Sequence, residues 1–326
     1  MSGSLPNRTV VTLALDAGGT FVKGGVLENG LLLPEPRLEQ PSCSEADAET
    51  ITARLADLTL RLAAAYMGSR SAAEHPVTFR IGAAFPGPFD YDLGVSLIKG
   101  LSKYEKLYGL SVGNLLRQEL YRRARLPGSC AWMSELASAE IAFGNDAALF
   151  GLGAAKRYPG ERLLCLTLGT GLGSVFIERG QSIRGTDGVP AGGMLYAELF
   201  EGRPVDEQFG RRGILALADG MQARQAGEDV VDLAHAAARN EPAALRVWHA
   251  YGERLGRMLR PYASAFRPHR LVLGGQIARS LPLFGTSLTE ALLPVLLPPQ
   301  YEEDLQPQVF GGIDLLFTGK GNAMAE

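Results

Sequence analysis

The sequence predicts an α/β protein built from two similar halves, and three observations support this class. Apolar runs typical of strands alternate with segments of helical spacing along most of the 326 residues. A plan of strand, glycine cluster and hairpin occurs twice, at residues 9–33 and 163–184. The length allows about two domains. We expect an α/β domain over residues 9–115, a second over residues 116–326, and a flexible N-terminus at residues 1–8.

The elements of the first half follow from local patterns. An apolar run that ends at Asp16, a glycine cluster, a second apolar run and the turn Glu28-Asn29-Gly30 predict a strand followed by a β-hairpin. Helical spacing over residues 45–67 predicts a helix, and residues 76–84 read as a strand. Residues 110–126 form a further amphipathic helix.

Further along the chain, a short apolar stretch, residues 140–143, brings Asn145 and Asp146 to its end. Helical composition resumes at residues 147–156, and the second glycine cluster with its hairpin follows. Helices are then expected at residues 229–239 and 243–258. A strand over residues 270–273 is closed by two glycines.

Composition excludes several classes of protein. The 32 basic and 35 acidic side chains leave a net charge of −3, so no basic excess is present to bind nucleic acid, and Arg122, Arg123 and Arg125 read as a solvated helix face. No apolar stretch approaches the roughly 20 residues of a membrane helix. Three widely spaced cysteines indicate neither disulfides nor a zinc site. We expect a soluble, cytoplasmic protein without structural zinc and without membrane or nucleic-acid partners.

The first glycine cluster has the composition of a phosphate-binding loop. Gly18, Gly19 and Thr20 follow Asp16 at the end of an apolar strand, and Lys23 lies just beyond. Glycines let backbone N–H groups approach an anion, and Asp16 could hold Mg²⁺ there, directly or through water. A plain glycine-rich turn remains an alternative for one cluster. Two such hairpins, one per half, favour a polyphosphate ligand gripped from both sides.

Four motifs in this order resemble the ROK family, within the superfamily of sugar kinases, hsp70 and actin. Residues 16–23, DAGGTFVK, resemble its DxGGTxxK; residues 169–173 resemble its GTGxG. Residues 271–275, LVLGG, resemble its adenosine-side strand, and residues 145–147 its Asn-Asp pair. The resemblance covers nearly the whole chain and implies a two-domain, duplicated ribonuclease H-like (actin-like ATPase) fold with an interdomain cleft.

The resemblance also implies roles for individual residues. Asp146 would be the general base and Asn145 would bind a sugar hydroxyl. Other contacts to the sugar would come from Phe85, Pro86, Gly87 and Glu207. Residues that would bind ATP or its phosphates are Asp16, Gly18, Gly19, Thr20, Lys23, Gly169, Thr170, Gly171, Gly173, Gly274 and Gly275.

Chemistry supports the assignment of Asp146 independently, because a hydroxyl that attacks a γ-phosphoryl group needs a carboxylate to accept its proton. Two alternatives stay open. Asn145 and Asp146 could simply cap a helix, since both residue types cap well. Glu135, which ends another short apolar stretch, is a rival for the base.

The sequence also departs from the family pattern. Gly193 and Tyr196 occupy the region where the family's kinases carry the Glu and His of an ExGH motif, and the cysteines of their zinc loop are absent. A standard glucokinase or N-acetylmannosamine kinase site is therefore not expected. Glu207 reads equally well as an acid favoured at a helix start.

Together these features predict a kinase that uses ATP and Mg²⁺ to phosphorylate a hydroxyl of a sugar or sugar derivative. A homodimer is left open. One alternative is a catalytically degenerate member of the fold that only binds sugar or nucleotide. A sugar-responsive repressor is disfavoured, because Asp16 lies too near Met1 for a preceding winged helix.

Overall fold

The computed structural model describes residues 8–70, 76–100, 103–293, 300–301 and 306–317. All of the predicted site residues lie within these ranges, whereas the predicted flexible N-terminus lies outside them except for Arg8. The chain forms two compact units. One runs to Leu149 and resumes at Gln306; the other extends from Phe150 to Leu305.

The first unit is built on a five-stranded sheet of order β3-β2-β1-β4-β7. The first three strands are antiparallel, and β4 and β7 join β1 in parallel. The strands are β1 (Thr9–Ala17), β2 (Phe21–Glu28), β3 (Leu31–Pro41), β4 (Val77–Phe85) and β7 (Glu140–Asn145), and a short hairpin of β5 (Phe89–Asp90) and β6 (Val95–Ser96) follows β4.

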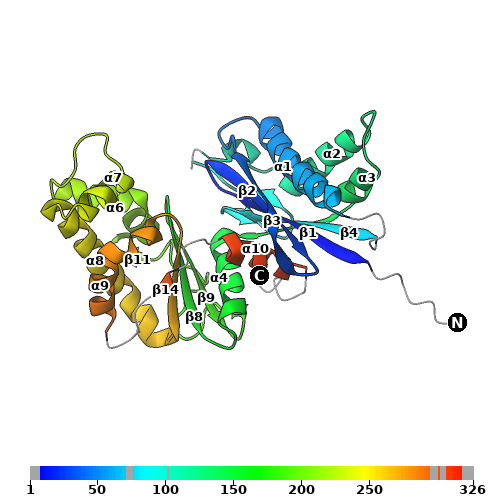
Figure 1. The fold of residues 1–326 in the computed structure, drawn as a ribbon. Coiled ribbons are helices and arrows are strands. Elements are labelled where there is room, and N and C mark those ends of the chain that lie inside the picture. The colour runs from blue at the N-terminus through cyan, green and yellow to red at the C-terminus, as the bar shows by residue number, and fades with distance from the viewer. Residues whose placement is uncertain (1–7, 71–75, 101–102, 294–299, 302–305, 318–326) are drawn as a thin grey trace. The chain divides into compact units, whose positions relative to one another are not determined.

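Helices cover both faces of this first sheet (Figure 1). A methyl group placed on Gly24 of β2 would meet Leu62 at 2.5 Å, whereas one on the next residue, Gly25, would meet Phe310 at 2.7 Å. Since neighbouring strand residues point to opposite faces, these contacts put two different helices on the two faces. The helices that belong to this unit are α1 (Ala48–Gly68), α2 (Val112–Ala124), α3 (Trp132–Ala137), the 3₁₀ helix η1 (Glu105–Leu107) and α10 (Gln306–Leu315).

The second unit repeats the topology, with sheet order β10-β9-β8-β13-β14. Its strands are β8 (Leu163–Leu168), β9 (Leu172–Glu178), β10 (Gln181–Ser182), β13 (Arg270–Gly274) and β14 (Gln300–Tyr301), with a hairpin of β11 (Leu199–Phe200) and β12 (Arg203–Pro204). Its helices are α5 (Val205–Phe209), α6 (Arg211–Gly220), α7 (Val230–Ala238), α8 (Pro242–Phe266), α9 (Leu281–Leu292) and the 3₁₀ helix η2 (Ile277–Ser280). The predicted duplication is thus confirmed.

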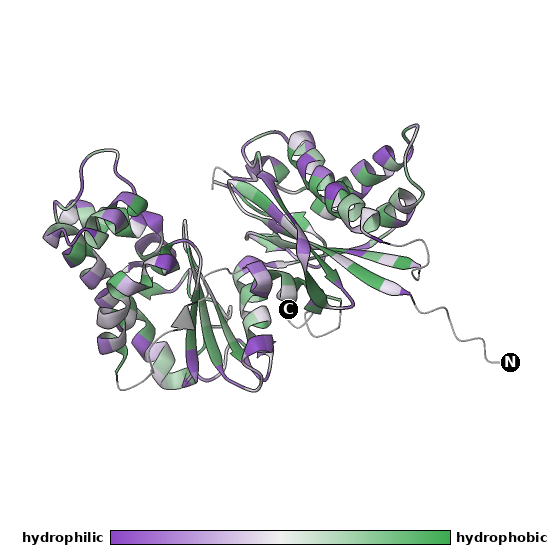
Figure 2. Ribbon diagram, in the orientation of Figure 1, coloured by the Kyte–Doolittle hydropathy of each residue, from purple (hydrophilic) through white to green (hydrophobic). Residues whose placement is uncertain are grey.

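Apolar residues concentrate along the strands of both sheets (Figure 2), and each unit has its own core. In β1 the run from Val11 to Leu15 is buried without a polar alternation, as expected for a strand covered on both faces. The amphipathic α1 begins at its N-cap Asp47, which accepts from the Thr50 N–H at 2.7 Å. Each sheet is therefore a rigid support for the loops at its edge.

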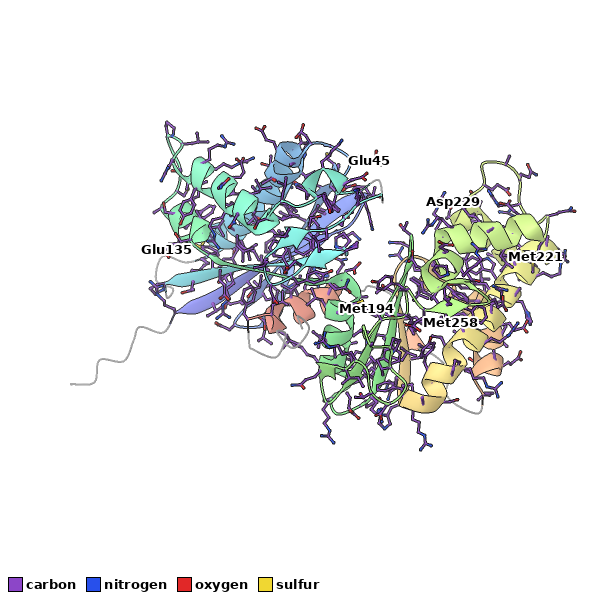
Figure 3. All side chains as sticks on the ribbon, turned by 180° about the vertical axis from the view of Figure 1, so that it is seen from behind. Glu45, Glu135, Met194, Met221, Asp229 and Met258 are labelled. Atoms are coloured by element: carbon purple, nitrogen blue, oxygen red, sulfur yellow. The ribbon has the colours of Figure 1, made fainter. Side chains whose placement is uncertain are left out.

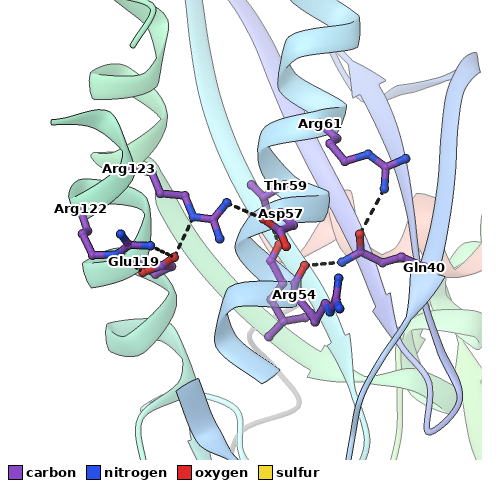
Figure 4. Close-up of polar contacts among 9 residues, drawn as sticks. Gln40, Arg54, Asp57, Thr59, Arg61, Glu119, Arg122 and Arg123 are labelled. Atoms are coloured by element: carbon purple, nitrogen blue, oxygen red, sulfur yellow. Dashed lines mark hydrogen bonds and ion pairs between the residues drawn. The ribbon is translucent and has the colours of Figure 1, made fainter. Parts of the chain in front are cut away.

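Arginines of α2 link this helix to α1 and to its own preceding turn (Figure 4). Arg122 donates two hydrogen bonds of 2.7 Å to Glu119, and Arg123 donates to Glu119 at 2.7 Å and to Asp57. The Arg122 hydrogen bonds, helped by Arg123, lower the pKa of Glu119 to about 2. Both arginines thus have carboxylate partners within the protein, so their positions are explained without a phosphate ligand.

The helix that follows the last strand of each sheet packs on the other sheet. α4 (Asp146–Arg157) follows the final strand of the first sheet, yet a methyl group on its Gly151 would meet Val175 of the second sheet at 2.2 Å. α10 follows the final strand of the second sheet and packs on β1 and β4 of the first. The predicted boundary after residue 115 differs from this division, because β7 pairs with β4 in the first sheet and keeps the chain in that unit up to Leu149.

We predict that Gly312→Ala destabilises the protein. A methyl group at this position of α10 would lie 2.0 Å from the carbonyl oxygen of Leu149 in α4, so the backbone of one helix must move. Overpacking of this kind costs about 1–3 kcal/mol in the free energy of unfolding, measured by urea denaturation. The matched control is Gly68→Ala, where nothing lies within 4 Å and little change is expected. Equal stability of the two variants would contradict the close approach of α10 and α4.

Candidate active site

Three predicted site residues end adjacent strands at one edge of the first sheet. Asp16 of β1 is paired in register with Ala84 of β4, and Phe85 of β4 with Asn145 of β7. These strands are parallel, so all three residues lie at the carboxyl ends, two strand spacings or about 10 Å across. This edge is where ligands bind in open α/β sheets.

The first glycine loop is held through its carbonyl groups. The hydroxyl groups of Ser42 and Ser44 donate to the Gly19 carbonyl at 2.6 and 2.5 Å, and the Tyr104 hydroxyl donates to the Gly18 carbonyl at 2.7 Å. Within the described residues, the N–H groups of Gly19 and Thr20 have no acceptor. A turn with fixed carbonyls and unpaired N–H groups is suited to bind an anion.

Asp16 lies beside this loop and has two neighbours that favour its charged form. Gln306, the first residue of α10, donates its amide to Asp16 Oδ2 at 2.7 Å, and Lys23 faces Asp16 across the β1–β2 pair. Loss of hydration nevertheless raises the pKa of Asp16, and the negative charge of Asp146 raises it further. The two carboxyl groups therefore lie within electrostatic reach of one another.

The Asn-Asp pair divides two tasks between its members. Asn145 Oδ1 accepts from the Ala148 N–H at 3.1 Å, and its amide donates to the Tyr91 hydroxyl at 3.2 Å. Asn145 thus caps α4, which agrees for this residue with the helix-cap alternative that the sequence left open. Asp146 Oδ1 accepts from the adjacent Ala147 N–H at 2.9 Å, and its side chain is exposed. The backbone N–H of Asp146 itself also donates to this carboxylate.

Two opposing effects act on the proton affinity of Asp146. The surrounding protein removes part of its hydration and raises its pKa, whereas the positive charge of Lys103 lowers it. Sequence reasoning missed Lys103. It lies in a loop without periodicity, and only the fold brings that loop over Gly19, so no local signal could have identified it.

Phe85, Pro86 and Gly87 follow β4 at this edge. The Phe85 ring is fully buried, with centroids 4.8 Å from the rings of both Phe89 and Tyr104, and Pro86 is buried as well. Only Gly87 is partly exposed. The predicted contribution of this segment to sugar binding stays a prediction, and it would come from the backbone rather than from the Phe85 side chain.

Glu135 lies away from this edge. It belongs to α3, which leads into the amino end of β7, where Arg80 is paired with Glu140. Figure 3 shows Glu135 and Glu45 at opposite ends of the first unit, and Glu45 follows Ser44, which holds the glycine loop. Glu135 therefore does not lie with Asp16 and Asp146 at this edge, and Asp146 as the base stays a prediction.

The second glycine loop, between β8 and β9, is braced by the α5–α6 corner. Asp206 Oδ1 accepts from the Leu172 N–H at 2.9 Å, and the Arg211 N–H donates to the Gly169 carbonyl at 2.9 Å. A methyl group on Gly171 would lie 2.0 Å from Asp206 Oδ1, so any larger residue would have to displace the Asp206 carboxylate. Thr170 is exposed at the tip of the loop, and Gly173, the second residue of β9, is paired with Thr167 of β8.

The α5–α6 corner contains Asp206, which was not among the predicted site residues, and Glu207, which was. Asp206 supports the loop, and the sequence signal was the same acidic helix start that drew attention to Glu207. Glu207 is exposed and forms an ion pair of 3.6 Å with Arg203. Its role as a sugar ligand stays a prediction, as does the effect of the nearby Tyr196, whose side chain is 53% exposed.

Gly274 and Gly275 make close contacts with the protein itself. A methyl group on Gly274 would meet the Phe150 ring at 2.8 Å, and one on Gly275 would meet the Leu168 carbonyl oxygen at 2.4 Å. Gly275 also has a φ of +94°, which disfavours other residues. Internal packing therefore explains both glycines, and their contact with a nucleoside stays a prediction.

The sequence and the structure were compared with those of known proteins. No protein-family model matches the sequence. No curated protein matches it either. Among solved structures, a ROK hexokinase from Thermus thermophilus superposes with a TM-score of 0.67 at 21% identity, covering 93% of this chain and 96% of that one. The chain has the ROK fold.

Two further ROK structures share the fold with different activities. A ROK glucokinase from Streptomyces griseus, solved with glucose and AMPPNP, has a TM-score of 0.65 at 18% identity and covers 94% of this chain and 98% of its own. A ROK transcriptional regulator, a homolog of the E. coli MLC protein, has a TM-score of 0.68 at 16% identity, covering 97% and 80%. The expected actin-like, two-domain fold is confirmed.

The described residues contain neither a cluster of metal ligands nor a helix that could span a membrane. No group of three or more His, Cys, Asp or Glu side chains gathers there in a way that could hold a metal ion. Nor does any helix in that part of the chain combine the length and apolarity needed to cross a membrane.

We predict that Asp206→Ala destabilises the protein while Glu207→Ala does not. Removal of the Asp206 acceptor leaves the Leu172 N–H unpaired beside the loop, at a cost of about 1–2 kcal/mol. The adjacent Glu207 has only an exposed ion pair, so its loss should change stability by less than about 0.5 kcal/mol. Urea denaturation of both variants measures the difference. A larger effect at Glu207 would contradict this account of the corner.

Proposed function

We propose that the protein transfers the γ-phosphoryl group of ATP to a hydroxyl group of a sugar or sugar derivative, in the presence of Mg²⁺. The observation that carries this proposal is the exposed carboxylate of Asp146, which lies at the same sheet edge as Asp16 and the first glycine loop. The fold, shared with sugar kinases, supports it.

The residues present suit magnesium. In phosphoryl transfer Mg²⁺ commonly has one or two protein carboxylates and completes its octahedral shell with water and phosphate oxygens, so Asp16 alone is a sufficient protein ligand. Bound there, the ion would neutralise charge on the phosphate oxygens. Gln306 orients the Asp16 carboxylate through its 2.7 Å hydrogen bond.

The chain's own groups then supply positioning and proton transfer. The N–H groups of Gly19 and Thr20 bind phosphate oxygens, and Asp146 accepts the proton of the attacking hydroxyl. The loop at Gly169–Gly173, fixed by Asp206, binds phosphate oxygens of the nucleotide by the same backbone chemistry.

The test is ADP release by the purified protein with Mg²⁺ and ATP against a panel of hexoses, N-acetylhexosamines and their derivatives. We expect turnover with at least one member above the background without acceptor. A regulator also has this fold, so sugar binding is measured by calorimetry in parallel. Binding without turnover across the panel would overturn the kinase proposal in favour of a sensor.

We further predict that Asp146→Asn lowers turnover by roughly 10²-fold or more, the usual effect of losing a positioned base. The amide oxygen can still accept from the Ala147 N–H, so the thermal midpoint should stay near the native value. The control is Glu135→Gln at the opposite end of the sheet, which should leave turnover unchanged. Native-like turnover of Asp146→Asn would contradict its role as base.

A further inference from the structure

Lys103 is held firmly by the residue that follows it. The Tyr104 N–H donates to the Ser44 carbonyl at 2.6 Å, and its hydroxyl donates to the Gly18 carbonyl at 2.7 Å. The Tyr104 side chain is fully buried, with its ring against Phe85. The backbone beside Lys103 is thus tied to both the glycine loop and the segment that supports it.

The side chain of Lys103 extends across the first glycine loop. Its Cδ lies 3.3 Å from the position that a methyl group on Gly19 would take. Its ammonium group has no carboxylate or hydrogen-bond partner among the described residues, and its charge acts on Asp146. A cation therefore lies beside the glycine turn and within electrostatic reach of the Asp146 carboxylate, without a direct ion pair to it among the described residues.

The other lysines of this region have different surroundings. Lys99 lies over the Tyr108 ring at 5.6 Å, and Lys106 is exposed in η1. Lys23 faces Asp16 across the strand pair. Of these four side chains, Lys103 is the one that both lies over the glycine loop and acts through its charge on Asp146.

We propose that Lys103 is a catalytic residue whose ammonium group binds the γ-phosphoryl group of the nucleotide during its transfer. This inference rests on the proposed function and adds a residue that none of the sequence motifs contains. The acceptor oxygen forms a bond to the γ-phosphorus as the bond to the β–γ bridging oxygen breaks, ADP leaves, and Asp146 takes the hydroxyl proton. Lys103 neutralises the oxygens of the group in transit.

The decisive experiment compares two nucleotides by calorimetry in the presence of Mg²⁺. Lys103→Met should weaken the binding of AMPPNP, which has a γ-phosphoryl group, by about tenfold or more, and should leave the binding of ADP within about twofold of native. Lys106→Met, the neighbouring exposed lysine, is the matched control and should bind both nucleotides as the native protein does. Lys103→Arg should recover part of the AMPPNP affinity because it keeps the charge.

A second readout separates catalysis from structure. With the sugar found active in the panel, Lys103→Met should lower kcat by roughly 10²-fold. The charged neighbours of Asp146 are Lys103 and Asp16. Loss of the Lys103 charge raises the pKa of Asp146, so the base becomes protonated at a higher pH. The acidic limb of the pH–activity profile should therefore lie at higher pH in Lys103→Met than in the native enzyme. A merely structural role for Lys103 would not move this limb.

The outcomes distinguish this inference from the proposed function. If the native protein binds both nucleotides and Lys103→Met binds AMPPNP equally well, the role of Lys103 is overturned and the kinase proposal stands. Equal weakening of ADP and AMPPNP also overturns it, because the contact would not be with the γ-phosphoryl group. If the native protein binds neither nucleotide, both proposals fail.

Discussion

The parallel alignment of β1, β4 and β7 is the constraint on which the candidate site depends. It brings residues separated by more than a hundred positions, Asp16 and Asp146, to one edge of a sheet that is buried on both faces. The glycine loop at that edge owes its shape to donors from elsewhere in the unit, the hydroxyl groups of Ser42, Ser44 and Tyr104. The strands and the loop, whose carbonyls accept these hydrogen bonds, thus support the N–H groups, the two carboxylates and Lys103 at this edge.

Much of the fold was predictable because its signals are local. The glycine cluster after β1 and its repeat after β8 each mark a strand–turn–strand unit, and the apolar periodicity of α1 and α8 is long enough to identify a helix. The positions of Asp16 and Asp146 at one sheet edge were predictable, because in both cases a motif coincides with a strand end. Other features of the site depend on which side chains are buried, and the motifs do not specify this. The sequence does not reveal that the Phe85 ring faces the core, that Asp206 rather than Glu207 braces the second loop, or that Gly274 fits against Phe150.

The domain boundary was not predictable for a different reason. α4 and α10 have ordinary helical composition, and the local sequence of either helix does not specify which sheet it will cover. The information lies in pairs of distant residues: Gly25 with Phe310 and Gly82 with Ile313 on one sheet, Gly151 with Val175 on the other. Glycines on the flat surfaces of a sheet or on a helix face allow close approach, but the partner is identified only once the whole chain has folded.

The exchange of helices has a consequence for the order in which the protein can mature on the ribosome. Gln306, which bonds Asp16, follows it by 290 positions. The first sheet therefore emerges with one apolar face bare and stays so while the whole second unit is synthesised. Contacts of such long sequence separation form slowly, and an uncovered sheet is prone to association with other chains. Until α10 arrives, the strands that it covers are without this cover, and the loop around Asp16 lacks the amide that orients its carboxylate.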